Sequence, residues 1–96
     1  MTSKQRQFLK RLAHPLEPVV RVGRGGVTDA VVEETRKSLL AHELIKVRID
    51  TDDSSARKAL AASLAEATSS ELAGAVGKIA ILYRARDEKP AIKLPR

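Results

Sequence analysis

The sequence predicts an α/β domain with helices packed on a four-stranded mixed sheet, its elements in the order α-β-α-β-α-β-β. Three segments carry apolar residues at helical spacing, and four shorter segments carry the alternating or continuous apolar runs of strands. Helix and strand patterns alternate along most of the chain, which is typical of β-α-β crossovers and parallel pairing. The last two strand patterns are separated only by Gly77-Lys78, as in a hairpin, so the sheet is mixed.

The first helix is expected over residues 2–13. Thr2 followed three residues later by Gln5 matches a capping box, and Pro15 disfavours helical backbone in His14, which ends the helix. One arc of this helix is apolar, with Phe8, Leu9, Leu12 and Ala13. The opposite arc is basic, with Lys4, Arg6, Lys10 and Arg11. This basic arc is either a surface that contacts a polyanion or a solvated helix face.

A short strand over 19–22 leads through a glycine-rich turn into a helix over 29–42, for which Thr28 is the expected N-cap. The following strand, 44–49, has the period of two that one buried face produces. Its apolar face consists of Ile45, Val47 and Ile49, and its polar face of Lys46 and Arg48.

The third helix is expected over 54–68, capped from Asp53 or Ser54, and its many alanines favour helix formation. A strand over 71–76 follows, although the small residues at its centre are poor strand formers. The last strand, 79–84, is strongly apolar. The tail 86–96 is charged and contains two prolines, so we expect an extended or loose segment there.

Length and composition indicate a single domain over residues 1–96. The net charge of +6 is unevenly distributed: residues 1–26 carry six Lys/Arg against one Glu, and residues 76–96 carry six against two acids, while 50–75 are acidic. Basic ends indicate a polyanionic partner, although a basic surface can also serve solubility alone. There is no cysteine and no apolar run of ~20 residues, so disulfides and a membrane span are not expected. A cytoplasmic protein is the simplest expectation.

The loop Gly23-Arg24-Gly25-Gly26 is the most specific motif. A strand, a glycine turn and a helix start place free backbone N–H groups where they suit a phosphate, with Arg21 and Arg24 adding charge. The spacing Gly23-x-x-Gly26 is the one that nucleic-acid modules use to clamp a sugar-phosphate backbone. A plain turn that needs positive φ is the simpler alternative.

Two nucleotide-binding motifs fit the loop poorly. A dinucleotide fingerprint would use Gly23-x-Gly25 and an acid such as Asp50 at the end of the next strand, but its third glycine position is occupied by Thr28. A Walker-type loop is excluded because no Gly-Lys-Ser/Thr follows at the required distance.

Catalytic and metal-binding groups are scarce. His14 and His42 lie at helix ends in separate segments, and His42 falls on the apolar side of its helix, where a packed or dipole-stabilised histidine is common. Asp50, Asp52 and Asp53 could hold a hard cation, but an acidic loop that caps a helix explains them more simply. We therefore expect no catalytic residue, no metal site and no cofactor.

Only Phe8 and Tyr83 are aromatic, and both fall in apolar stripes that point inward. Readers of single-stranded sequence generally stack bases on exposed aromatics, so this chain is expected to recognise folded RNA through its backbone and shape. The expected RNA-binding residues, besides the four of the loop, are Arg21, Lys46, Arg48, Lys4, Arg6, Lys10 and Arg11.

Five segments, taken in order, resemble the stand-alone bacterial CRM domain, whose bacterial members are called YhbY; CRM stands for chloroplast RNA splicing and ribosome maturation. They are Leu12-Ala13-His14-Pro15-Leu16, Gly23-Arg24-Gly25-Gly26, His42-Glu43-Leu44-Ile45-Lys46-Val47, Gly77-Lys78 and Leu82-Tyr83-Arg84. The resemblance implies a KH-like RNA-binding domain with a fold akin to the C-terminal domain of translation initiation factor three. It also implies an association with precursors of the large ribosomal subunit. The strand 71–76 departs from the family, being smaller and less β-branched.

The resulting hypothesis is a monomeric RNA-binding accessory factor that acts on ribosomal RNA during large-subunit assembly. It catalyses no reaction and takes no small-molecule substrate. The alternative is a non-catalytic interaction module that binds DNA or an acidic protein. The sequence identifies neither the RNA element nor the assembly step.

Overall fold

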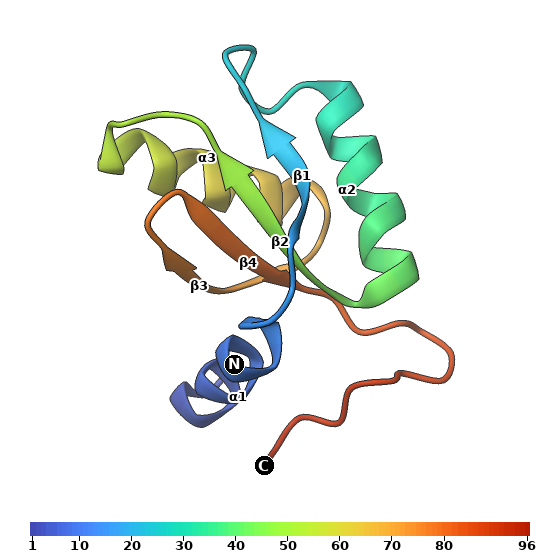
Figure 1. Cartoon of the computed structure of the whole chain (residues 1–96). Helices are drawn as coiled ribbons and strands as arrows, with labels where there is room; N and C mark the ends of the chain where they lie inside the picture. The colour runs from blue at the N-terminus through green and yellow to red at the C-terminus, as the bar shows by residue number, and fades with distance from the viewer.

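The computed structural model describes all 96 residues and contains the seven expected elements in the expected order (Figure 1). The helices are α1 (Ser3–Ala13), α2 (Asp29–His42) and α3 (Ser54–Ala67). The strands are β1 (Pro18–Val22), β2 (Leu44–Ile49), β3 (Glu71–Val76) and β4 (Ile79–Tyr83). The predicted fold class is confirmed, and the capping box of Thr2 and Gln5 is formed at the start of α1.

The four strands form one mixed sheet in the order β1-β2-β4-β3. β1 and β2 are parallel, whereas β4 is antiparallel to both of its neighbours, β2 and β3. Because β1 and β2 are parallel, their carboxyl ends meet at one edge of the sheet. The backbone N–H of Asp50, just after β2, donates to the carbonyl of Val22 at the end of β1 over 2.9 Å. The loops that lead into α2 and α3 therefore start side by side.

One face of the sheet carries the larger core, which α2 and α3 cover (Figure 1). The predicted alternation of β2 is confirmed, since Ile45, Val47 and Ile49 are buried in this core. Leu39 of α2 and Leu64 of α3 pack against them from the helix layer. The charged side chains of β2 consequently point to the opposite face of the sheet.

The opposite face is covered only in part, by α1. Leu9 and Ala13 of α1 are fully buried against the sheet residues Leu44, Ala73, Ile81 and Tyr83. Leu12, expected on the buried arc, is instead exposed, because α1 meets the sheet through a narrower stripe. In Figure 1, α1 lies at the end of the molecule away from the loop that joins β1 to α2. The rest of this sheet face is left open.

The small residues of β3 have a packing reason. The pairing of β3 with β4 is irregular between Leu72 and Gly74, so that Ala73 is an extra residue, and Ala73 is buried under α1. A Cβ atom on Gly74 would lie only 2.7 Å from Cε of Lys10, whose side chain runs over this glycine. Larger β-branched residues would therefore push α1 away from the sheet.

The tail after β4 contains no helix or strand, but it is held against the domain by the fully buried carboxylate of Glu43. One oxygen of this carboxylate accepts the backbone N–H of Arg86 at 2.8 Å. The other accepts the N–H groups of Ala91 and Ile92 at 2.7 and 3.1 Å. Further along, the carbonyl of Pro95 accepts a hydrogen bond from the side chain of Gln5 in α1. The tail thus links the end of α2 to α1.

Glu43 itself has unusual backbone geometry. It caps α2 with a φ of 62°, a conformation that costs roughly 1–2 kcal/mol for a residue other than glycine. Burial acts to raise the pKa of Glu43, but the three backbone donors, helped by the Arg86 guanidinium, outweigh it and hold the pKa below the ordinary value. The carboxylate therefore stays ionised and keeps its three N–H partners.

The Glu43→Gln variant is expected to lower the free energy of unfolding by about 1.5–3 kcal/mol at neutral pH, since a neutral amide accepts weakly and turns an NH2 toward N–H donors. The pKa of Glu43 is lower in the folded state than the ordinary value of 4.5. The difference in unfolding free energy between the native chain and the variant is therefore largest above pH 4.5, and it is lost as the pH falls through the folded-state pKa. Urea unfolding at pH 7 and over a series of pH values falling from 4.5 measures this difference. Glu88→Gln, an exposed change in the same tail, is the control, and equal destabilisation by both variants contradicts the anchor.

Candidate nucleic-acid interface

The loop from Gly23 to Gly26 is a tight turn at the carboxyl end of β1. The N–H of Gly26 donates to the carbonyl of Gly23 at 3.1 Å, and Gly26 has a φ of +71°. The other two glycines have no such requirement: a Cβ on Gly23 would meet nothing within 4 Å, and one on Gly25 would make an ordinary contact with Thr28 at 3.4 Å. The geometry of the turn requires glycine only at position 26. At positions 23 and 25 glycine is not needed for the fold, and its effect there is to leave the loop backbone free of side chains.

The backbone N–H groups of this loop are largely unused. Those of Gly23, Arg24, Gly25 and Val27 donate to no acceptor within the chain. The N-terminus of α2 lies next to them: Thr28 accepts the N–H of Val31 at 3.2 Å, and the N–H groups of Asp29 and Ala30 donate to no acceptor within the chain. Such a group of converging N–H donors at a helix start suits an anion. Arg24, exposed and without an acidic partner, adds a full charge.

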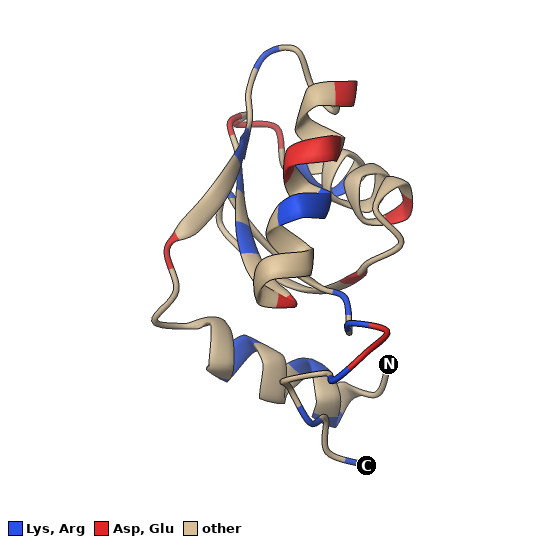
Figure 2. Ribbon diagram, turned by 90° about the vertical axis from the view of Figure 1, so that its right-hand side faces the viewer, with Lys and Arg blue, Asp and Glu red and all other residues tan.

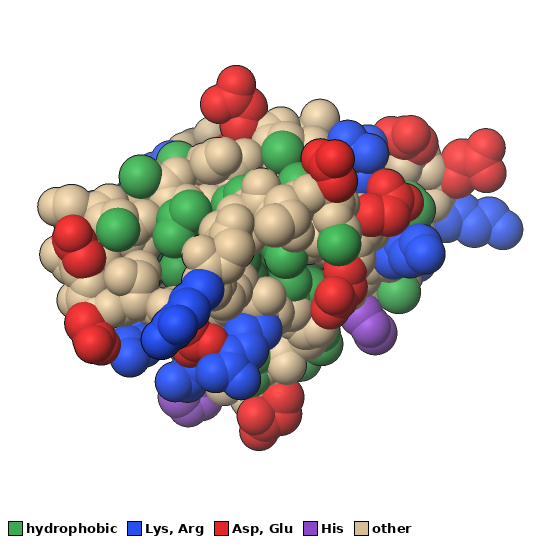
Figure 3. Space-filling view, turned by 90° about the horizontal axis from the view of Figure 1, so that it is seen from above, with side chains coloured by type: hydrophobic (Ala, Val, Ile, Leu, Met, Phe, Trp, Pro, Cys, Tyr) green, Lys and Arg blue, Asp and Glu red, His purple; other side chains and the backbone are tan.

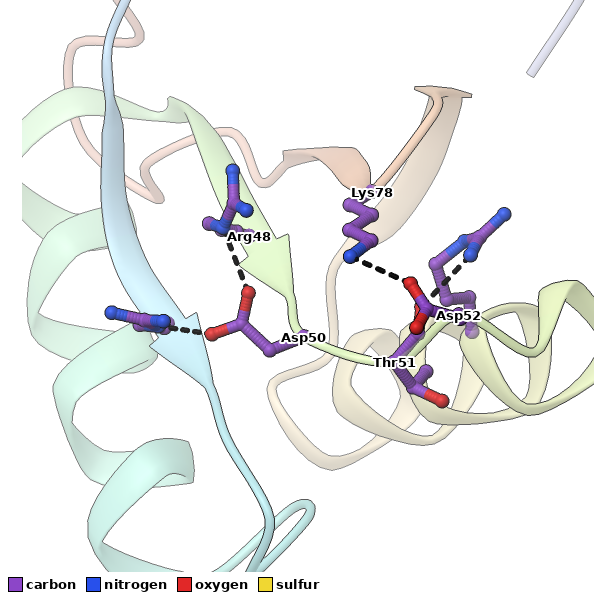
Figure 4. Close-up of polar contacts among 7 residues, drawn as sticks. Arg48, Asp50, Thr51, Asp52 and Lys78 are labelled. Atoms are coloured by element: carbon purple, nitrogen blue, oxygen red, sulfur yellow. Dashed lines mark hydrogen bonds and ion pairs between the residues drawn. The ribbon is translucent and has the colours of Figure 1, made fainter.

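Two of the expected arginines are joined by an acid (Figure 4). Asp50 accepts from Nε of Arg21 through one oxygen and from Nε of Arg48 at 2.7 Å through the other. These hydrogen bonds, that of Arg21 first, lower the pKa of Asp50. The side chains of Arg21 and Arg48 remain 73% and 47% exposed. Asp50, which the sequence offered as a cation ligand or ribose-binding acid, instead braces two arginines whose remaining N–H donors face solvent.

One further ion pair and one hydrogen bond lie at the same edge of the sheet. Lys78, in the turn between β3 and β4, contacts the carboxylate of Asp52 at 2.8 Å, and Arg57 donates to the carbonyl of Thr51 at 2.8 Å (Figure 4). Sequence reasoning missed Lys78 and Arg57, because they come from elements far along the chain. Asp53 caps α3 by accepting from Ser55 at 2.9 Å. Each of the three aspartates therefore has partners of its own, and none of these partners is shared.

The open sheet face continues the basic surface toward α1. Lys46 lies on this face and donates to the carbonyl of His14 at 3.0 Å. The four basic residues of α1 are divided: Arg6 and Lys10 flank the groove beside β3, whereas Lys4 and Arg11, seven residues apart, lie on the outer side of the helix. Figure 2 shows Lys and Arg at the loop tip, on the sheet and on α1. The structure thus places Arg21, Arg48, Lys46 and Lys10 along the open sheet face between the loop and α1, and sets Lys4 and Arg11 apart.

Viewed from the loop end, Lys and Arg side chains gather around an acidic one at one edge of the molecule, and acidic side chains lie mostly elsewhere (Figure 3).

His42, expected on the apolar side of α2, is exposed, since the helix ends there and buries Leu39 instead. None of the three helices has the length and hydrophobicity to cross a membrane.

A strand, a glycine turn and a helix start beside a basic sheet face are typical of α/β domains that bind nucleic acids. The model of the CRS1/YhbY (CRM) domain family matches residues 1–84, and the chain belongs to this family.

Related proteins match over the full length of the chain. An RNA-binding protein of Haemophilus influenzae is 38% identical over 96 residues, covering 100% of this chain and 96% of the relative. YqeI of Bacillus subtilis, named a probable RNA-binding protein, is 35% identical over 95 residues and 99% of both chains. A solution structure from Staphylococcus aureus, whose description proposes RNA binding, superposes with a TM-score of 0.88 at 36% identity and 99% coverage of both chains.

The two ends of the loop respond differently to alanine. Gly26→Ala is expected to lower the free energy of unfolding by about 1 kcal/mol, because the backbone at Gly26 has a positive φ that alanine adopts only with strain. Steric contact adds nothing to this effect, since the nearest atom to a new Cβ is 3.7 Å away. Gly23→Ala, in open space, is the matched control and is expected to change stability by less than about 0.5 kcal/mol. Chemical denaturation compares the two variants. Equal effects contradict the assigned backbone geometry.

Proposed function

We propose that this protein is an RNA-binding accessory factor that binds ribosomal RNA of large-subunit precursors during ribosome assembly. The observation that carries the RNA part is the loop of free N–H donors at residues 23–26 beside the arginine pair of Arg21 and Arg48. Membership of the CRM family and the names of the relatives support the same partner. The assignment to ribosomal RNA of large-subunit precursors rests on the resemblance of the sequence to the CRM family.

In this proposal the loop binds one phosphate group of the RNA, and the basic sheet face binds the neighbouring phosphates along the RNA strand. The N–H groups of Gly25 and Val27 donate to phosphate oxygens, and Arg24 supplies the opposite charge. Arg21 and Arg48, kept in place by Asp50, offer their outward N–H donors to the next phosphates. Phosphate contacts of this kind fix position and give affinity that depends strongly on salt.

The protein is proposed to act as a monomer in the cytoplasm and to bind without catalysis. The three aspartates after β2 have structural partners: Asp50 pairs with two arginines, Asp52 with Lys78, and Asp53 with the start of α3. The two histidines lie apart, His14 at the end of α1 and His42 at the end of α2. This arrangement favours a binding surface over a catalytic centre.

Gly25→Asp is expected to weaken RNA binding by about tenfold or more, because a carboxylate blocks the approach of a phosphate and repels it. The fold is expected to persist, since the added Cβ meets only Thr28. Gly25→Ala adds the same Cβ without charge and is the control. For the native protein, log affinity should fall by ~0.7–0.9 per phosphate contact for each unit of log salt. Anisotropy titrations measure both, and an unchanged affinity in folded Gly25→Asp means that the loop is only a turn.

The cellular partner is tested by crosslinking the protein in living cells, followed by sequencing of the attached RNA. Precursors of the large-subunit ribosomal RNA are expected to be enriched over mature RNA, and Gly25→Asp is expected to reduce the yield. Recovery of DNA or of an acidic protein, with no ribosomal RNA, would favour the alternative interaction module and reject the ribosomal role.

A further inference from the structure

The open sheet face contains a recess of about 240 Å³ between α1 and the strands. We define it by its six lining residues: Lys10, His14, Lys46, Val76, Ile79 and Ile81. It lies on the face opposite to α2 and α3, beside the arginine pair rather than at the loop. No carboxylate lines it.

The floor of this recess is apolar and made by cross-strand neighbours. Val76 of β3 pairs with Ile79 of β4, and Ile81 pairs with Gly74, so these side chains share one face. Val76 is 67% exposed, an unusual position for a valine in a strand. Lys10 lies over Gly74 and Ile81 is buried beneath α1, so the open part of the floor is made by Val76 and Ile79.

The rim of the recess is basic. The aliphatic part of Lys10 crosses above Gly74, and its ammonium group remains exposed. Lys46 is fixed by its bond to the carbonyl of His14 and retains two further N–H donors. Arg48 lies directly opposite Ile79 in the β2–β4 pairing and connects this rim to Arg21. Asp50, the acid beside Arg48, has both oxygens occupied by those arginines.

An apolar floor inside a cationic rim fits a flat, weakly polar group attached to phosphates. A volume of 240 Å³ is below the ~300–1,000 Å³ of sites for drug-sized ligands, so it suits one planar ring system and not a larger molecule. An RNA strand whose phosphates follow Arg21, Arg48 and Lys46 would carry its bases over this floor.

We infer that the recess holds the base of one unpaired nucleotide of the bound RNA, with Val76 and Ile79 against the face of the base and Lys10 and Lys46 on the flanking phosphates. This inference rests on the proposed RNA binding and adds a base contact to it. Aliphatic side chains here take the part that exposed aromatics play in other single-strand readers. The bound RNA is therefore expected to present an unpaired nucleotide at this position.

The test compares a fluorescein-labelled twelve-nucleotide oligouridylate with an abasic oligomer of the same length and the same phosphates. The native protein is expected to bind the base-bearing oligomer about fivefold more tightly, the lower end for one base contact. Val76→Gln should remove most of this preference and leave the affinity for the abasic oligomer unchanged, because no charge changes. Leu40→Gln, a similarly exposed aliphatic at 64% on α2, is the matched control and should keep the preference.

The outcomes separate the recess from the proposed function. Equal affinity for both oligomers, with both weakened by Gly25→Asp, overturns the recess and leaves phosphate binding intact. A preference that Val76→Gln does not reduce places the base elsewhere and also overturns the inference. If neither oligomer binds the native protein, RNA binding itself fails and the inference fails with it.

Discussion

A buried carboxylate, that of Glu43, fixes four parts of the chain relative to one another. Its residue ends α2 and precedes β2, its carbonyl accepts the N–H of Arg84 after β4, and its side chain holds the tail at Arg86, Ala91 and Ile92. The tail in turn contacts α1 through Pro95 and Gln5. α1 covers one end of the open sheet face. By holding the tail that contacts α1, the Glu43 carboxylate therefore also helps to fix where the basic residues of α1 lie relative to the sheet. The backbone conformation that Glu43 adopts would suit glycine better, which indicates that the side chain is retained for its hydrogen bonds.

The proposed binding surface follows from one topological fact, the parallel pairing of β1 and β2. Parallel strands bring their carboxyl ends to the same edge, and each strand is followed there by a loop and a helix start. That edge collects the free N–H donors of the glycine loop from one connection and Asp50 from the other. Asp50 then holds one arginine from each strand, so its negative charge organises a positive surface. The antiparallel strand β4 extends the same face toward α1 and supplies the apolar floor of the recess.

Local patterns in the sequence were sufficient for the elements and their order. Period-two alternation identified the buried face of β2, and the Thr2–Gln5 capping box located the start of α1. The loop was found because glycine spacing and a following N-cap are local signals. The same signals indicate which residues are basic, but not which of them lie together.

Long-range contacts were the part that sequence reasoning could not provide. The brace formed by Asp50 joins residues 29 positions apart, and the anchor formed by Glu43 reaches 43 to 49 positions along the chain. The tail was expected to be extended or loose because its composition favours no helix or strand; its attachment depends on one buried acid elsewhere. Gly74 makes the sequence of β3 a poor match to a strand pattern. The presence of a glycine at this position is explained only by the close approach of the Lys10 side chain in the folded structure. A glutamate between the end of a helix and the start of an apolar strand is the one sequence signal that could have suggested the anchor.

In the proposed complex, backbone N–H groups of the glycine loop donate to RNA phosphates. Amide nuclear magnetic resonance during titration with RNA tests it most directly, because each N–H of the loop gives its own signal. The signals of Gly23, Arg24, Gly25 and Val27 are expected to move first and furthest, and those of the exposed residues Glu33 and Glu34 on α2 are expected to stay in place. Large changes elsewhere, with the four loop signals unmoved at saturating RNA, would contradict it.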